Sequence, residues 1–169
     1  MAHLKLPALN QLGLNIKKIC WKYNSTNYKQ FRALIINDFN IKIDLWMQKN
    51  NIDLNLKKEY EQVLLYWTFI NYKKEKQLTE TLLNNGFNWA QPTNAFVDTV
   101  YKIDLLAKKD NIVYAIQVKP SKTNTNNFNY KTFLNACNKL NLVPLLAFKK
   151  HNKWTMINFE NGEMIWKQK

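Results

Sequence analysis

The sequence predicts an α/β (α+β) fold in which helices flank a mixed central sheet, preceded by a helical N-terminal extension. Apolar residues recur every three to four positions up to about residue 86, and β-branched and aromatic residues dominate from 96 to 119. A further helix and two more strands follow. The 169 residues suit one domain with an appendage. We therefore expect the extension over residues 1–55 and the main domain over residues 56–169.

The extension is predicted to consist of short helices. The segments FRALIINDF and KIDLWMQKN each have helical apolar spacing, and Asn-rich breaks lie between them. A third segment, KKICWKYNSTNYKQFR, interleaves lysines with Trp and Tyr. This mixture is compatible with nucleic-acid contact, but a packed helix whose lysines face solvent is the more common outcome.

The main domain is expected to start with two helices. LKKEYEQVLLYWTFINY carries a helical apolar stripe, and KKEKQLTETLLNNGF ends at Gly86, which suits a left-handed C-cap. An extended segment containing Phe87 and Trp89 then stops at Pro92.

Two antiparallel strands are predicted next, at Phe96–Ala107 and Asn111–Lys119, joined by a tight KKDN turn. Alternation along the second strand puts Gln117 and Lys119 on the same face. After a polar loop we expect a helix at FNYKTFLNACNKLN and two strands at VPLLAFKK and KWTMINF.

The balance of charged residues indicates what kind of partner the protein binds. Twenty-five Lys and Arg residues face twelve Asp and Glu residues, which gives a formal charge of +13. Such an excess suggests a polyanionic partner, although compositional bias toward Asn and Lys in the genome is an alternative explanation. The chain has no apolar run of about 18 residues and no secretory signal at its start, so we expect a cytoplasmic protein without a membrane span.

The predicted hairpin carries the residues that point to chemistry. Asp104 lies in the apolar run VYKIDLLA, where a carboxylate is costly unless it is paired or binds a metal. Pairing of the strands would bring it within about 5 Å of the strand that carries Gln117 and Lys119. An Asp carboxylate beside another oxygen donor suits Mg²⁺ or Mn²⁺ and the hydrolysis of phosphodiesters. The alternative is a surface ion pair between Asp104 and Lys119 on an edge strand.

Three segments between about residues 70 and 158 together resemble the PD-(D/E)XK nuclease superfamily. They are EKQLTETLLNNGF, VYKIDLLAKKDNIVYAIQVKPSK and FLNACNKLNLVPLLAFKKHNKW, in that order. The closest likeness is to archaeal Holliday-junction resolvases and to small homing endonucleases of this fold. The resemblance implies a restriction-endonuclease-like core.

By this resemblance, Glu75 is the helix carboxylate near the metal, Asp104 the main metal ligand, Gln117 the second ligand and Lys119 the catalytic lysine. Other acidic residues have weaker claims. Glu80 is a rival for the role of Glu75, Asp98 is either a first acidic position or a strand-edge residue, and two are expected in solvent: Glu59 and Glu61.

The function implied is that of a Mg²⁺-dependent DNA endonuclease of the homing, restriction or junction-resolving kind. Cutting both strands of a duplex needs two active sites, so a homodimer or higher homo-oligomer is expected. Gln117 stands where most of the superfamily has Glu, which removes one negative charge from the site. A catalytically inactive nucleic-acid-binding protein is therefore the alternative, and an assembly factor without a nucleic-acid role is a third. Five lysines are candidates for phosphate contact: Lys102, Lys108, Lys109, Lys122 and Lys131.

Overall fold

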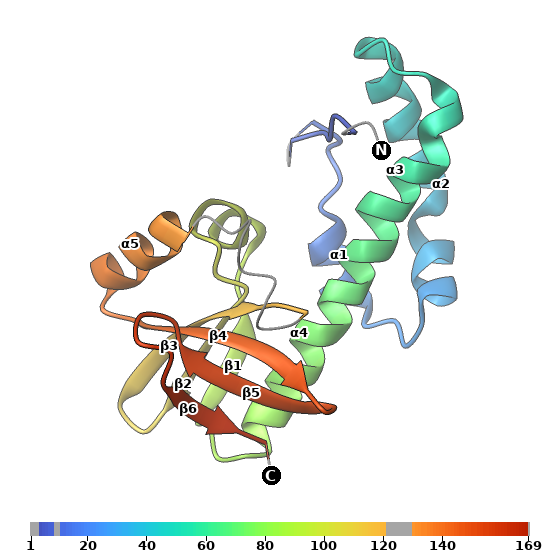
Figure 1. Cartoon of the computed structure of the whole chain (residues 1–169). Coiled ribbons are helices and arrows are strands. Elements are labelled where there is room, and N and C mark those ends of the chain that lie inside the picture. The colour runs from blue at the N-terminus through green and yellow to red at the C-terminus, as the bar shows by residue number, and fades with distance from the viewer. Residues whose placement is uncertain (1–3, 9–10, 121–129, 169) are drawn as a thin grey trace. The chain divides into compact units, whose positions relative to one another are not determined.

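Two units make up the chain in the computed structural model, which describes residues 4–8, 11–120 and 130–168 (Figure 1). We call Met1–Lys73 the helical unit and Lys74–Lys169 the sheet unit. Residues 56–73, which the sequence analysis grouped with the main domain, pack within the helical unit.

The helical unit contains α-helices, one 3₁₀ turn and one π-helical turn. They are α1 (Ile16–Tyr23), α2 (Tyr28–Lys49), the 3₁₀ turn η1 (Leu54–Leu56), α3 (Lys57–Glu61), the π turn η2 (Gln62–Tyr66) and α4 (Trp67–Leu83), whose later part belongs to the sheet unit. Neither α2 nor any other helix in the described ranges is long and apolar enough to span a membrane.

The expected break between two short helices at Asn40 and Ile41 was wrong, because α2 is continuous for 22 residues. Phe31, Ile35, Phe39 and Ile43 recur every four residues along it, and none is more than 2% exposed. Burial of this stripe outweighs the modest helix propensity of the intervening Asn residues.

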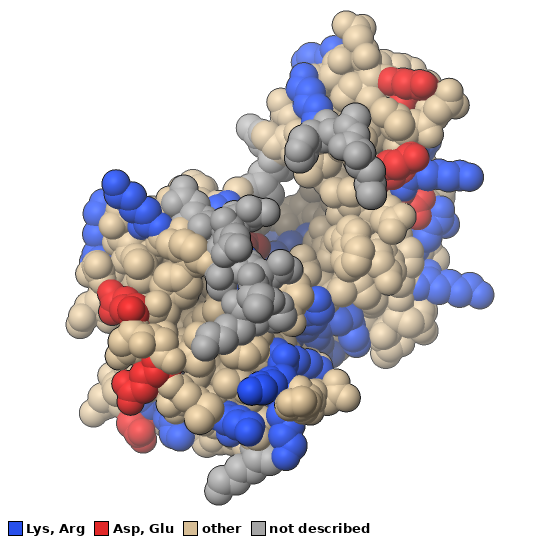
Figure 2. Space-filling model, viewed as in Figure 1, with Lys and Arg blue, Asp and Glu red and all other residues tan. Residues whose placement is uncertain are grey.

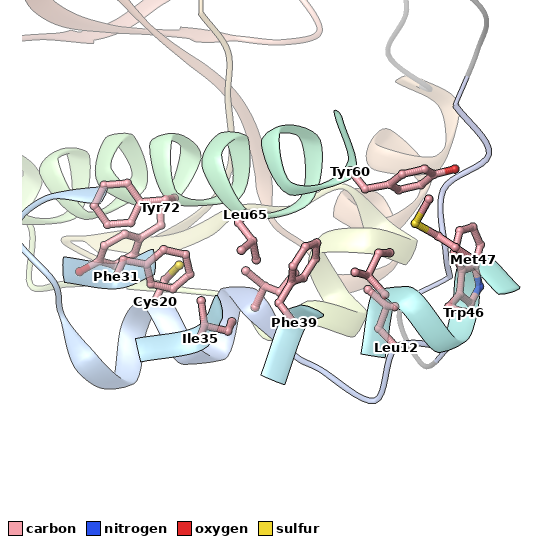
Figure 3. Close-up of a cluster of buried hydrophobic side chains, with 13 residues drawn as sticks. Leu12, Cys20, Phe31, Ile35, Phe39, Trp46, Met47, Tyr60, Leu65 and Tyr72 are labelled. Atoms are coloured by element: carbon pink, nitrogen blue, oxygen red, sulfur yellow. The ribbon is translucent and has the colours of Figure 1, made fainter. Parts of the chain in front are cut away.

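The core of the helical unit is rich in aromatic side chains (Figure 3). The rings of Phe31 and Phe69 stack with centroids 5.3 Å apart, and Trp21 meets Tyr72 edge-on at 5.1 Å. Such pairs add roughly 0.5–1.5 kcal/mol beyond their apolar burial. Side chains of α1, α2 and α4 thus form a hydrophobic core within this unit.

The sheet unit contains a six-stranded mixed sheet whose strands are neighbours in sequence order. All neighbouring pairs are antiparallel except β3 and β4, which are parallel and have α5 (Tyr130–Leu140) between them in sequence. The predicted α+β class with a mixed sheet is confirmed, with a last strand that was not expected. The strands are β1 (Trp89–Pro92), β2 (Leu105–Lys109), β3 (Ile112–Val118), β4 (Val143–Lys150), β5 (Lys153–Asn158) and β6 (Met164–Lys167).

Helices cover both faces of the sheet (Figure 1). Leu78 and Leu82 of α4 pack on one face, in a cluster that includes Ile116 of β3. Phe133 of α5 packs on the other face, in a cluster that includes Ala115 of β3. Because side chains alternate along a strand, Gln117 shares the α5 face with Ala115.

The predicted strand at Phe96–Ala107 was partly wrong, because strand β2 begins only at Leu105. A π-helical turn, η3 (Val97–Tyr101), occupies most of the earlier part and ends at Lys102 in the left-handed region. The Asn94 side chain accepts a hydrogen bond from the backbone N–H of Val97 at 2.9 Å, which favours this helical start. Val97 and Tyr101, four residues apart, both pack against the cluster around Phe133 of α5.

Candidate functional site

The register of the β2–β3 hairpin sets the centre of the candidate site. Leu105 pairs with Ile116, so the preceding residue, Asp104, lies opposite Gln117. The backbone N–H of Asp104 donates to the carbonyl of Ile116 at 3.0 Å, which extends the pairing by one residue. The pairing that the sequence predicted between these two polar residues is therefore present.

The Asp104 carboxylate is buried and hydrogen-bonded. Its Oδ2 accepts bonds from Gln117 Nε2 at 2.8 Å and from the backbone N–H of Val118 at 2.7 Å. Asp104 and Gln117 are each 7% exposed. These two donors offset part of the cost of removing a carboxylate from water.

The amide of Gln117 has its oxygen pointed away from Asp104. A carboxylate only accepts hydrogen bonds, so the NH₂ group must face Asp104 and Oε1 must face the other way. Gln117 Oε1 is buried, and no donor within the described part of the chain bonds to it. An unsatisfied buried oxygen costs roughly 1–3 kcal/mol and can ligate a hard cation. Sharing one cation with Asp104 would require the amide to turn over and give up its bond to Asp104 Oδ2.

Lys119 lies just beyond the end of β3, half-buried, with its backbone N–H donating to the carbonyl of Ala147 at 2.8 Å. Burial is the largest influence on its pKa and lowers it below the ordinary value of 10.5. The negative charges of Asp104 and Asp98 oppose this shift, whereas Lys102 reinforces it. The side chain of Lys119 is therefore within electrostatic range of three charged residues, of which Asp104 acts most strongly.

Glu75 is placed by α4. It is 5% exposed, and it precedes Leu78 and Leu82 on the helical stripe that packs against the sheet. The hydroxyl of Thr79, on the same side of the helix, donates to the Glu75 carbonyl at 2.9 Å. A buried carboxylate at a position where α4 otherwise carries leucine is unusual for a purely structural helix.

The remaining acidic candidates face solvent or have partners of their own, with one exception. Glu80 is exposed on α4, with Oε1 3.5 Å from the Lys76 ammonium, and Glu59 is exposed on α3. Glu61 is only half-exposed, which corrects the expectation that it faces solvent: it belongs to the helical unit, where Arg32 donates to both of its carboxylate oxygens. The exception is Asp98, which lies on η3 within electrostatic range of Lys119 rather than on a strand edge.

The five candidate lysines fall into different places. Lys102 acts electrostatically on Lys119, and Lys131 is exposed on α5. Lys108 and Lys109 lie toward the other end of β2, about 13–17 Å along the strand from Asp104. The Lys109 ammonium sits 5.6 Å from the centre of the Phe87 ring. The fifth lysine, Lys122, lies outside the described residues.

The η3 turn was not predicted from the sequence, although it brings Asp98 and Lys102 within electrostatic range of Lys119. The helical spacing of Val97 and Tyr101 and the cap at Asn94 were the signals that could have revealed it. They were masked by the β-branched and aromatic composition of the segment.

A metal at this site would need the amide oxygen. Among residues 4–8, 11–120 and 130–168 there is no group of three His, Cys, Asp and Glu side chains arranged to hold a metal ion. The predicted set of Asp104, Gln117 and Glu75 contains only two carboxylates, so Gln117 Oε1 would have to serve as the third ligand.

Comparison with known proteins adds no family assignment. No protein-family model matches the sequence, and no curated protein matches it.

Proposed function

We propose that the protein is a metal-dependent DNA endonuclease with a restriction-endonuclease-like core, in which Asp104, Gln117 and Glu75 bind the cation and Lys119 assists hydrolysis. The observation that carries the proposal is the buried Asp104–Gln117 pair, with its amide oxygen left without a hydrogen bond among the described residues and with Lys119 beside it.

The order of elements supports this proposal. The resemblance to the PD-(D/E)XK superfamily requires an acidic helix, a hairpin bearing Asp and Gln-x-Lys, a second helix, a strand entered through a proline and a closing hairpin. The chain has elements of these kinds in the same order: helix α4, hairpin β2–β3, helix α5, strand β4 with Pro144 as its second residue, and hairpin β4–β5.

The residues present fit a hard divalent cation. Asp104 supplies an anionic oxygen and Gln117 a neutral one, and Glu75 is a second buried carboxylate on α4, the helix that packs on the other face of the sheet. A cation shared by all three would have to lie at the strand ends, where the two faces meet. Bound Mg²⁺ or Mn²⁺ would polarise the scissile phosphate and lower the pKa of an attacking water.

Lys119 has the properties of an assisting cation. Half-burial strengthens its electrostatic interaction with a phosphate, because the surrounding medium screens charge less than bulk water does. Its ammonium donates hydrogen bonds only, so it can orient a water molecule and offset charge that develops on the phosphoryl oxygens.

One observation favours the second candidate, an inactive nucleic-acid-binding protein. Oδ2 of Asp104 is satisfied by two N–H donors without any cation, through the bonds from Gln117 and Val118. A Glu at position 117 could not make this bond in its ionised form. The hydrogen-bonded pair is thus compatible with a descendant that has lost catalysis.

The deciding experiment compares cleavage of supercoiled plasmid and branched DNA with and without Mg²⁺. Asp104→Asn keeps the shape of the side chain and one acceptor oxygen while removing its charge, and Lys119→Ala removes the ammonium. Two exposed residues provide matched controls, Glu80→Ala and Lys153→Ala. Metal-dependent cleavage should fall at least 100-fold in the first two variants and stay unchanged in the controls.

Cleavage that survives in Asp104→Asn would exclude this site. If no protein cuts either substrate, the same samples are tested for DNA binding and then with genomic DNA of the source as a library of native targets. Binding without cleavage of that library would establish the second candidate.

An active enzyme of this kind is also expected to form a homodimer or higher homo-oligomer when bound to duplex DNA. Light scattering after size-exclusion chromatography of the complex with a short duplex measures this. A strictly monomeric complex that nevertheless cuts both strands would contradict the expectation.

A further inference from the structure

A group of exposed cationic side chains surrounds the turn between α1 and α2. Lys18 and Lys22 lie one helical turn apart on α1, and Lys29 is in the first turn of α2. Tyr23, which is 50% exposed, has the Lys22 ammonium 5.0 Å from the centre of its ring. We call these four residues the cationic turn.

The backbone that carries these side chains is well anchored. Asn24 ends α1 in the left-handed conformation, and its side chain accepts a bond from the Tyr72 hydroxyl at 2.8 Å. Asn27 caps α2 by accepting from the backbone N–H of Gln30, and the Thr26 hydroxyl donates to the Gln30 side chain. The lysines therefore extend from a fixed turn, which lowers the entropy cost of binding a partner.

The segment that carries this turn has no acidic residue of its own, and Glu61, which accepts from Tyr28 at the start of α2, is paired with Arg32. No Asp or Glu precedes Asp38 in the sequence. In Figure 2 the acidic side chains of the helical unit that face the viewer lie toward the end where α2 leads into η1 and α3. Basic residues elsewhere in this unit have acidic partners, such as Lys57 with Asp44 at 2.7 Å and Arg32 with Glu61 at 2.6 Å.

Stability does not explain Lys18 and Lys29 of the cationic turn. In the described part of the chain no carboxylate forms an ion pair with Lys18, Lys22 or Lys29. Like charges four residues apart on a helix, as at Lys18 and Lys22, cost about 0.2–0.5 kcal/mol. The amino end of α2 adds partial positive charge at the same turn, while Lys22 offsets the partial negative charge at the carboxyl end of α1.

The aromatic residues of this segment indicate which nucleic acid fits. Trp21 is committed to the core through its edge-on contact with Tyr72, which leaves Tyr23 as the exposed ring beside the lysines. A single ring does not make a stacking platform for successive unpaired bases. Three lysines on a fixed turn instead suit the phosphates of a duplex.

We propose that the cationic turn of the helical unit binds the phosphate backbone of duplex DNA, as a contact surface separate in sequence from the hydrolytic residues. The inference rests on the proposed function, because it takes duplex DNA as the substrate. It also resolves the choice left open for KKICWKYNSTNYKQFR: the lysines and Tyr23 contact DNA, and Trp21 holds the helix in place.

The test is the salt dependence of binding, measured by fluorescence anisotropy with a labelled duplex in EDTA, where no cleavage occurs. The triple variant Lys18→Ala/Lys22→Ala/Lys29→Ala is compared with Lys42→Ala/Lys49→Ala/Lys58→Ala, which removes three charges from the other end of the same unit. The first variant should lose roughly tenfold or more in affinity at physiological salt. Its slope of log K against log salt should fall by about two to three, since each phosphate contact contributes about 0.9.

Equal losses in the two triple variants would overturn the proposal, because only net charge would then matter. Tighter binding of single-stranded RNA than of duplex DNA by the wild type, lost in the first variant, would also overturn it. Thermal unfolding checks that both variants are folded: five of the six lysines are exposed, and Lys42 is partly buried with its ammonium 3.0 Å from the Gly13 carbonyl. If Asp104→Asn binds like the wild type and no protein cleaves, the proposed activity fails while the cationic turn stands.

Discussion

At the scale of single residues, the pairing of Gln117 with Asp104 is the feature that the candidate site depends on. A neutral amide donates to the carboxylate at 2.8 Å, whereas an ionised Glu would place a second negative charge there. The neutral amide at position 117 thus keeps the charge of the site low and also makes the buried pair stable without a cation.

Replacing Gln117 by Glu should therefore make the stability of the protein depend on divalent cations. Without metal, loss of the hydrogen bond and repulsion between two carboxylates should cost about 1–3 kcal/mol. Millimolar Mg²⁺ should restore more stability to the variant than it adds to the wild type, because two carboxylates bind a hard cation more strongly. Thermal unfolding with and without Mg²⁺ measures this.

The exposed Gln91→Glu on β1 is the matched control, and it should show no specific response to Mg²⁺. Identical Mg²⁺ responses of the two variants would mean that Gln117 is not part of a cation site.

At the scale of elements, α2 is tied to α3 by a small polar network outside the core. The Arg32 guanidinium donates to Glu61 at 2.6 and 3.0 Å, and the Tyr28 hydroxyl donates to Glu61 at 3.2 Å. The hydrogen bond from Arg32 is the largest influence on the pKa of Glu61 and lowers it. Burial, reinforced by Glu61, raises the pKa of Tyr28 from 10.0 to about 12.

This network predicts two limits of pH for the stability that it contributes. Glu61 has a lowered pKa in the folded protein, so its contribution is present above its ordinary pKa of 4.5 and is lost as the pH falls below that value. Tyr28 has a raised pKa, so its contribution is present below pH 10 and is lost as the pH rises toward about 12. Glu61→Gln should cost up to about 1 kcal/mol at neutral pH and progressively less as the pH falls below 4.5.

Urea unfolding of the wild type and Glu61→Gln between about pH 3 and pH 7 measures the first limit. The exposed Glu59→Gln on the same helix should stay level with the wild type throughout. A difference for Glu61→Gln that is as large at pH 3 as at pH 7 would argue against this account.

At the scale of the whole molecule, the chain contains separate hydrophobic cores in the helical unit and on the two faces of the sheet. Helix α2 contributes buried side chains to only one of these cores, that of the helical unit. Phe39 is fully buried in the core of the helical unit, whereas Ile41, two residues later, is 62% exposed.

Phe39→Ala should therefore destabilise the helical unit by about 3–5 kcal/mol, whereas Ile41→Ala should change its stability by less than about 0.5 kcal/mol. Hydrogen exchange read by mass spectrometry locates the effect. Peptides from α1 and α2 should lose protection in Phe39→Ala, and those from β2 to β5 should keep it. Equal loss of protection in both units would show that they unfold as one cooperative body.

Sequence patterns alone predicted much of the sheet unit, because the deciding interactions there are local. A hairpin with a short turn fixes its own register, so the pairing of Asp104 with Gln117 followed from spacing. The positive φ of Gly86 at 82° after α4 was likewise predicted from its place behind an apolar helical run. The order of helical and strand-like segments along the chain predicted the α+β class and the mixed sheet.

Tertiary packing decided the rest. Three features depend on partners that are distant in sequence. They are the continuity of α2 across its Asn residues, the helical turn η3 in a segment of strand-like composition, and the burial of Glu75. The direction of the Gln117 amide also required the Asp104 carboxylate to be in place. Helix propensities differ by less than about 1 kcal/mol per residue for most residue types, so the burial of apolar side chains against a distant part of the chain overrides them. A local sequence pattern does not indicate which distant part that will be.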